Sequence, residues 1–246
     1  MAGVSVADVL ESREVVVAFE GLRAVDGVDL KLARGEILGL IGPNGAGKTT
    51  LLNTLSSFQR PSSGRVLLGH VDITGWPVHR VAAEGVGRTF QSGRIFKRLT
   101  VFENVLAATV SLGLRQREAH AYASHQLERL DLLRYAALAA GTLPYGLARR
   151  LGIARALGLR PRFLLLDEPA AGLNEEETET LVSALRRLQA DDGMGLLVIE
   201  HDVPMIMRVC DRIHVLDHGR TLAVGTPAQI QSDEAVRAAY LGAPLT

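Results

Sequence analysis

A glycine-rich segment near the start of the chain constrains its fold more than any other part of the sequence. Residues 42–49 read Gly-Pro-Asn-Gly-Ala-Gly-Lys-Thr and fit the pattern G-x-x-x-x-G-K-[ST]. A short apolar run, 37–41, precedes this segment, and Leu51, Leu52 and Leu55 follow it at helical spacing. A strand, a glycine loop and a helix in this order predict an α/β fold whose loop N–H groups can bind phosphate.

Each part of this loop has a chemical role if it holds a nucleoside triphosphate. Glycines let the backbone approach phosphate oxygens where a side chain would clash. Lys48 supplies a compact positive charge to the β- and γ-phosphates, and the Thr49 hydroxyl is a candidate ligand of Mg²⁺. The alternative is a glycine-rich turn with a stray lysine. The candidate nucleotide-binding residues are Gly42, Pro43, Asn44, Gly45, Ala46, Gly47, Lys48, Thr49 and Thr50.

Two carboxylates follow another buried strand. The apolar run 163–166 ends in Asp167 and Glu168, which places both at the carboxyl end of a strand, where open α/β sheets bind ligands. Asp167 is expected to hold the metal ion, and Glu168 is expected to act as the general base toward an attacking water. A strand that ends in a solvated acidic turn is the alternative. Beside a phosphate loop, the pair favours hydrolysis.

Composition excludes several other classes of protein. The chain has 246 residues, of which 47% are hydrophobic and 22% charged, so it has enough residues for one or two domains with a proper core. Twenty-seven basic residues balance 27 acidic ones, which argues against a nucleic-acid-binding surface. The single cysteine cannot form an internal disulfide, no apolar run could span a bilayer, and residues 1–12 do not read as a signal peptide.

The order of apolar patterns predicts how the chain is organised. Nearly continuous apolar runs indicate strands of a parallel sheet at 37–41, 163–166, 196–199 and 213–216. Segments 15–17 and 25–32 indicate antiparallel edge strands, and 101–159 has helical spacing instead. Asn174 and Glu177 predict the capped start of a helix that ends near Gly193. We expect three parts, namely 1–90, 91–160 with the helical insertion, and 161–246.

Further motifs resemble those of the ATP-binding-cassette ATPases and follow in the family's order. They are Gln91 after Arg-Thr-Phe, the segment 143–155 that begins Leu-Pro-Tyr-Gly, the run 171–174 after the carboxylates, and His201 after Leu-Val-Ile-Glu. The resemblance spans residues 15–241. It implies a phosphate-loop (RecA-like) core with a parallel sheet, an N-terminal antiparallel β subdomain and an inserted α-helical subdomain. It also implies that the chain hydrolyses ATP with Mg²⁺.

The same resemblance implies roles for particular residues. Gln91 would sense the γ-phosphate and the metal ion and link them to the partner, His201 would contact the γ-phosphate and water, and Phe19 would lie under adenine. Tyr145 and Gly146 would offer N–H groups to ATP bound on a second subunit. Read without their neighbours, the glutamine is an ordinary surface residue, the histidine a core residue and the phenylalanine a packing residue.

The signature segment departs from the family pattern Leu-Ser-Gly-Gly-Gln. Pro144 replaces the serine and Leu147 the glutamine, and a proline has neither a hydroxyl nor an N–H. Asn174 also replaces the acid that is usual after the two carboxylates. We therefore expect a weaker contact with the γ-phosphate across the subunit interface.

Several segments are similar to those of ATPase subunits of branched-chain amino-acid importers, including Ile-Glu-His-Asp at 199–202 and Gly-Thr-Pro-Ala-Gln-Ile-Gln at 225–231. This resemblance implies a homodimer, or a heterodimer with a paralogous ATPase. It also implies partner permease subunits, an extracytoplasmic solute-binding protein and a peripheral place on the cytoplasmic face of the inner membrane. The alternatives are the ATPase of a lipopolysaccharide exporter and a soluble cassette ATPase without a transport role.

Clustered phenylalanines suggest where a permease docks. Phe90, Phe96 and Phe102 are three of the six phenylalanines in the chain, and all lie close to Gln91. Aromatic residues are enriched where partners anchor. We expect a groove here that receives a short permease helix; the alternative is that these are ordinary core residues.

Overall fold

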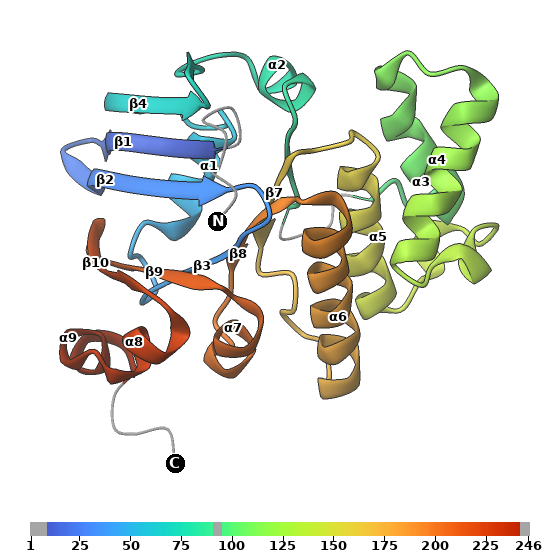
Figure 1. The fold of residues 1–246 in the computed structure, drawn as a ribbon. Coiled ribbons are helices and arrows are strands. Elements are labelled where there is room, and N and C mark those ends of the chain that lie inside the picture. The colour runs from blue at the N-terminus through green and yellow to red at the C-terminus, as the bar shows by residue number, and fades with distance from the viewer. Residues whose placement is uncertain (1–8, 91–94, 242–246) are drawn as a thin grey trace.

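The computed structural model describes residues 9–90 and 95–241, with the backbone alone for residues 240 and 241. Figure 1 shows two sheets and a group of helices beside them. The strands are β1 (Val9–Phe19), β2 (Leu22–Ala33), β3 (Ile37–Ile41), β4 (Ser63–Leu68), β5 (Val71–Asp72), β6 (Val86–Arg88), β7 (Phe163–Asp167), β8 (Gly195–Ile199), β9 (Arg212–Asp217) and β10 (Arg220–Gly225).

Helices connect most of these strands. They are α1 (Lys48–Leu55), α2 (Val78–Ala83), α3 (Val101–Thr109), α4 (Gln116–Arg129), α5 (Tyr145–Leu157), α6 (Glu175–Asp192), α7 (Val203–Val209), α8 (Pro227–Ser232) and α9 (Glu234–Val236). Short turns η2 (Val110–Leu112), η3 (Leu133–Tyr135) and η4 (Ala140–Thr142), and a π-helical turn η5 (Arg237–Leu241), complete the described chain. Within these residues, no helix combines the length and the apolar character needed to cross a membrane.

The larger sheet has the strand order β10-β9-β3-β8-β7-β6, with parallel pairing from β9 to β6 and an antiparallel edge strand, β10. Every residue of β3, β7 and β8 is buried. Alternate residues of a strand point to opposite faces, so Leu38 and Leu40 join a core with α1, and Ile37 and Ile41 join a core with α6 and α7. Burial on both faces explains why the sequence shows continuous apolar runs here.

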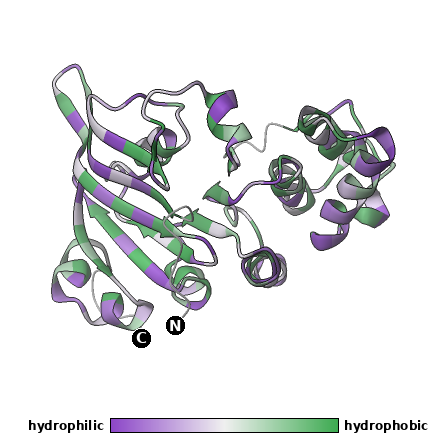
Figure 2. Ribbon diagram, turned by 45° about the horizontal axis from the view of Figure 1, so that its top comes forward, coloured by the Kyte–Doolittle hydropathy of each residue, from purple (hydrophilic) through white to green (hydrophobic). Residues whose placement is uncertain are grey.

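The smaller sheet is antiparallel and has the order β2-β1-β4-β5. The predicted antiparallel pairing of segments 15–17 and 25–32 is confirmed as β1 against β2. Segment 15–17 is not an edge strand, however, because β1 lies between β2 and β4. Along β2, Val28, Leu30 and Leu32 are buried, and the residues between them are exposed. Figure 2 shows this alternation as bands of hydrophobic and hydrophilic residues.

The helices α3, α4 and α5 pack against one another beside the larger sheet (Figure 1). They cover most of the range 101–159 in which helical spacing was predicted. The predicted helix after Asn174 is also confirmed as α6, where Asn174 and Glu177 form a reciprocal capping box and Gly193 ends the helix in a left-handed conformation. The division of the chain at residues 90 and 160 stays a prediction.

Candidate active site

The loop 42–47 packs directly on the backbone of two strands. Gly42 and Gly47 have φ angles of 148° and 98°. A Cβ atom on Gly42 would meet the carbonyl of Leu216 in β9, and one on Gly47 would meet the carbonyl of Ala24 in β2. Both positions therefore require glycine for conformation and for space. This packing fixes the loop between β3 and α1.

The Lys48 side chain packs against the backbone of this loop. Its side chain is 6% exposed, and Nζ donates hydrogen bonds to the carbonyl oxygens of Gly42 at 2.7 Å and Pro43 at 2.9 Å. Burial lowers the pKa of Lys48, whereas the charges of Glu168 and Asp167 raise it. No side chain caps the N-terminus of α1, and its first turn has no acidic residue. The loop and helix therefore form a cationic cradle with the chemistry that a polyphosphate requires.

A cavity of about 400 Å³ opens over this cradle. Its residues come from the end of β1, the start of β2, the phosphate loop, the end of β7 and the turn after β8. They are Phe19, Ala24, Asn44, Gly45, Ala46, Gly47, Lys48, Thr49, Thr50, Glu168 and His201. The fold thus brings most of the candidate nucleotide-binding residues to one cavity of a size typical for small-ligand sites. Ala24 was not foreseen, because it contributes through strand packing rather than a motif.

Glu168 lies at the rim of the cavity and faces His201. Oε1 of Glu168 is 3.1 Å from Nε2 of His201, which is 44% exposed. The backbone of Glu168 has a φ of 50°, and its N–H donates to the carbonyl of Ile199 in β8 at 2.9 Å. A non-glycine residue rarely adopts such a φ, and strained residues of this kind cluster at functional sites. The arrangement places a carboxylate and an imidazole where both can reach a water molecule.

Asp167 is buried at the end of β7 rather than exposed at the rim. Its Oδ2 is 3.6 Å from Nη2 of Arg88, and both side chains are less than one-tenth exposed. Burial raises the pKa of Asp167, and the nearby Arg88 guanidinium opposes this shift. Asp167 and Thr49 supply the carboxylate and hydroxyl oxygens that magnesium prefers. The third predicted metal ligand, Gln91, lies outside the described residues.

A second buried carboxylate, Glu200, was not predicted as part of the site. It is 3% exposed and accepts hydrogen bonds from the backbone N–H groups of Ala170 and His201. Burial raises its pKa, and these two hydrogen bonds oppose the shift. Glu200 therefore holds the segment after Glu168 against the segment that carries His201. The sequence shows that Glu200 precedes His201, but it does not show that the Glu200 side chain is buried.

Tyr145 and Gly146 do not line this cavity but begin α5. Pro144 is the N-cap residue and provides no side-chain hydrogen bond, as the departure from the family pattern predicts. The Tyr145 side chain is about half exposed, and its hydroxyl accepts two hydrogen bonds from Arg149. A Cβ on Gly146 would collide with the Glu177 carboxylate. The first turn of α5 thus lies directly against the start of α6.

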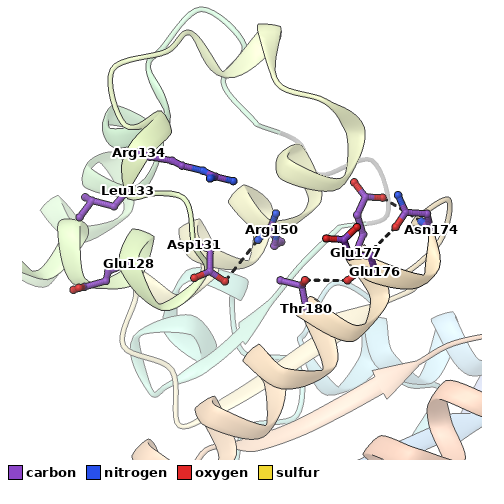
Figure 3. Close-up of a pocket in the computed structure, with 9 residues that line it drawn as sticks. All are labelled: Glu128, Asp131, Leu133, Arg134, Arg150, Asn174, Glu176, Glu177 and Thr180. Atoms are coloured by element: carbon purple, nitrogen blue, oxygen red, sulfur yellow. Dashed lines mark hydrogen bonds and ion pairs between the residues drawn. The ribbon is translucent and has the colours of Figure 1, made fainter.

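Figure 3 shows a larger cavity, of about 690 Å³, between α4, α5 and α6. Several of its polar groups bond to one another or to nearby backbone. Asn174 and Glu177 form the α6 capping box, and Arg150 lies 3.8 Å from Asp131 and donates to the carbonyl of Leu130 at 3.2 Å. Asp131, which follows α4, also lies 3.8 Å from Nη2 of Arg187 in α6, so it links α5 to α6. We therefore assign this cavity to structure rather than to catalysis.

A further cavity of about 570 Å³ contains two of the three clustered phenylalanines. We call it the docking groove. Its lining residues are Arg88, Phe90, Phe96, Ala107, Ala108, Ser111, Gly152, Arg155, Ala156 and Leu159. Phe102 was expected here but packs against His120, with ring centres 5.3 Å apart, and against the helical core. Phe102 belongs to α3, which begins at Val101, whereas Phe96 precedes this helix.

Two family models match most of the chain, and curated relatives match nearly all of it. A model described as "ABC transporter" matches residues 25–171, and one described as "Branched-chain amino acid ATP-binding cassette transporter" matches residues 220–245. The high-affinity branched-chain amino acid transport ATP-binding protein BraF of Pseudomonas aeruginosa is 43% identical over 95% of this chain and 98% of its own length. LivG of Escherichia coli K12, with the same description, is 43% identical over 93% of this chain and 95% of its own.

A more distant curated relative is the lipopolysaccharide export system ATP-binding protein LptB of Escherichia coli K12, which is 35% identical over 95% of this chain and 97% of its own length. Among solved structures, the ADP conformation of MJ1267, an ATP-binding cassette of an ABC transporter, matches with a TM-score of 0.86 and 29% identity, over 96% of this chain and 99% of that one. The dimeric cassette MJ0796 bound to ADP and Pi matches with a TM-score of 0.80 and 25% identity, over 89% and 98%.

Proposed function

Because the chain belongs to the ATP-binding-cassette family of transport ATPases, we propose that it is the ATP-hydrolysing subunit of an importer for branched-chain amino acids. The observation that carries this choice of branch is the match of residues 220–245 to the branched-chain amino acid cassette model. Export of lipopolysaccharide is the second candidate, since LptB is also similar along the whole chain, but at lower identity.

Binding of ATP begins at the phosphate loop. The loop N–H groups and the N-terminus of α1 face the phosphates, and Lys48 shifts from the carbonyls of Gly42 and Pro43 to the β- and γ-phosphates. Phe19, which is about half exposed at the cavity edge, offers its ring to adenine. Thr49 and Asp167 would hold Mg²⁺, with Gln91 as the further ligand inferred from the family. A bound Mg²⁺ would supply positive charge near the phosphate oxygens on which negative charge develops.

Hydrolysis requires a water in line with the γ-phosphate. Glu168 accepts a proton from this water as it attacks, and His201 orients the water and contacts the γ-phosphate. Oε1 of Glu168 and Nε2 of His201 are 3.1 Å apart, close enough for both groups to act on the same water molecule. Glu200 supports both, because it fixes the backbone on either side of them.

The site of one subunit is completed by a second subunit. Tyr145 and Gly146 begin α5 and do not line the cavity of their own chain, so ATP held by a partner subunit is the recipient that we assign to their N–H groups. A homodimer and a heterodimer with a paralogous ATPase both satisfy this geometry. ATP-driven closure of the pair would then move the permeases. Pro144 limits the strength of this contact.

The docking groove is the surface that we assign to the permeases. It is lined largely by apolar side chains, and Phe96 is half exposed at its wall. A short amphipathic helix of a membrane permease fits such a groove. The chain would then lie on the cytoplasmic face of the inner membrane, and an extracytoplasmic solute-binding protein would deliver substrate to the permeases.

Co-purification tests this assignment. We expect that the chain, extracted from membranes in mild detergent, is recovered with two permeases and a solute-binding protein, and that Phe96→Asp abolishes recovery of the permeases. Leu138→Asp is the matched control, since Leu138 is about equally exposed but is not a groove residue. Permeases recovered equally with Phe96→Asp would contradict the groove. Recovery with lipopolysaccharide transport proteins would favour the exporter.

A further inference from the structure

Arg88, the last residue of β6, is buried where three parts of the molecule meet. Its side chain is 8% exposed. Nη1 donates a hydrogen bond to Oδ1 of Asn53 at 2.6 Å and lies 3.2 Å from Oγ of Ser56, and both partners belong to the C-terminal end of α1. Nε donates to the carbonyl of Thr89 at 3.2 Å. A planar guanidinium with these partners is held in one orientation.

Nη2 of this guanidinium faces the candidate metal ligand. Nη2 of Arg88 is 3.6 Å from Oδ2 of Asp167, whose side chain is 6% exposed. Two charges at this distance interact more strongly away from water than at the surface. Thr89, the residue after Arg88, also contacts Asp167: its Oγ1 lies 3.4 Å from the backbone nitrogen of Asp167. The segment 88–89 therefore sets the position of Asp167 from the neighbouring strand.

The same guanidinium also contacts two aromatic rings. Its central carbon lies 4.9 Å from the ring centre of Phe58 and 4.8 Å from that of Phe90. The two rings meet edge to face at 5.2 Å. Phe90 and Arg88 both line the docking groove. One side chain thus touches the groove, the end of α1 and the carboxylate of Asp167.

We propose that Arg88 is a positioning residue that transmits occupancy of the docking groove to the metal site at Asp167. A helix that enters the groove contacts Phe90, and displacement of that ring changes the surface against which the guanidinium packs. Because Nη2 faces Asp167, the same displacement changes how tightly the carboxylate is held away from a metal ion. The inference rests on the proposed function, which assigns both the groove and the metal site.

A double-mutant cycle on the purified chain tests this role without permeases. The four proteins are wild type, Phe90→Ala, Arg88→Met and the double variant. The measurement is the Kd for Mn²⁺, followed by electron paramagnetic resonance with a saturating non-hydrolysable ATP analogue. Arg88→Met is expected to bind Mn²⁺ more tightly, by about threefold or more, because the metal no longer shares Asp167 with a buried cation.

The decisive quantity is the effect of Phe90→Ala in the two backgrounds. We expect Phe90→Ala to change the Mn²⁺ Kd at least about threefold when Arg88 is present and less than about 1.5-fold in Arg88→Met. Equal changes in both backgrounds, or no change in either, would overturn the role of Arg88. Arg80→Met is the matched control. The central guanidinium carbon of Arg80 lies 3.4 Å from the ring centre of Trp76, and neither residue lines the docking groove or the nucleotide cavity. The Phe90→Ala effect must persist in this control.

Two additions keep the outcome interpretable. If Arg88→Met does not fold, Arg88→Lys replaces it, because lysine retains the charge but cannot bridge Asp167 and Asn53 with a planar fork. Retention of the full Phe90→Ala effect in Arg88→Lys would overturn the proposal. Affinity for the analogue in EDTA is measured beside each Kd. A wild type that fails to bind the analogue refutes the proposed function, whereas normal binding with an additive cycle refutes the role of Arg88 alone.

Discussion

Single buried charges determine the properties of the candidate site. Burial lowers the pKa of Lys48 and raises those of Asp167 and Glu200, so each group is less easily charged than in water. Neighbouring charges or hydrogen bonds oppose every one of these shifts. Lys48 has two carboxylates nearby, Asp167 has Arg88, and Glu200 has two backbone N–H groups. Removal of one partner is therefore expected to affect the site more than removal of an exposed charge.

Glu168→Gln tests the assignment of Glu168 as the general base. The amide cannot accept a proton from water, so we expect kcat to fall at least about 100-fold, the usual contribution of general base catalysis. ATP binding should remain, and the ATP-bound dimer should accumulate. Steady-state phosphate release and size-exclusion chromatography measure the two effects. Glu128→Gln, an exposed change on α4, is the control. Normal turnover in Glu168→Gln would remove this residue from the base role.

The lowered pKa of His214 gives a prediction of how the unfolding free energy depends on pH. Burial, together with the nearby Arg212, lowers the pKa of its side chain to about 4, and Asp29 opposes the shift. The unfolded chain takes up this proton near pH 6.5, so the contribution to stability is present above that pH and is lost as the pH falls toward 4.

Urea unfolding at pH 7 and pH 5 measures this effect. Linkage gives a loss of about 2 kcal/mol of unfolding free energy from His214 between these two pH values. His214→Gln retains a polar group opposite Thr221, which lies 2.9 Å from the ring in the wild type. We expect the variant to be less stable at pH 7 but to lose about 2 kcal/mol less on acidification. An identical loss in both proteins would show that His214 titrates normally.

At the scale of elements, the first turn of α5 is where this chain differs most from its family pattern. Pro144 leaves the helix without a side-chain cap. Gly146 has no space for a side chain, because the Glu177 carboxylate lies against it. The helix is held by packing instead, since Leu147, Leu151 and Ala154 are buried in the core. The element is therefore well placed but lacks one donor toward a phosphate.

Pro144→Ser is expected to strengthen this contact. Serine restores both an N–H and a capping hydroxyl, and a helix cap contributes about 1 kcal/mol. In the Glu168→Gln background, the ATP concentration that gives half-maximal dimer should fall by about fivefold. Light scattering during an ATP titration measures it. Pro144→Ala restores the N–H alone and should give an intermediate value. If neither variant changes the titration, the N-terminus of α5 does not contact the nucleotide.

The sequence indicates some elements of this fold better than others, for physical reasons. Strands buried on both faces, such as β3, show as continuous apolar runs, and the phosphate loop shows as a motif. The short strands β4, β5 and β6 were not foreseen, because they mix polar residues with few apolar ones. Arg88 and Glu200 were missed because their roles depend on which strands are neighbours. The clustering of Phe102 near Phe96 was misleading, since only the structure shows the direction of each ring.

In the proposed function, the whole molecule combines one nucleotide cavity with two surfaces that would serve other chains. The cavity lies at the carboxyl ends of the parallel strands, where β3, β7 and β8 end together (Figure 1). The start of α5 is not among the residues that line this cavity, and the docking groove lies between β6 and the helices α3 and α5. In the proposed function, this separation would allow ATP bound at one place to bring two subunits together and to act on a third partner.

Titration calorimetry with ATP, with and without magnesium, tests the central claim most directly. We expect the purified chain to bind one ATP, with higher affinity when Mg²⁺ is present, because Thr49 and Asp167 then contribute. Lys48→Ala should weaken binding by at least about tenfold, since a hydrogen bond to a charged group contributes about 1.5–3 kcal/mol. A chain that shows no saturable binding of ATP, or whose binding is independent of both magnesium and Lys48, would contradict the assignment of this cavity.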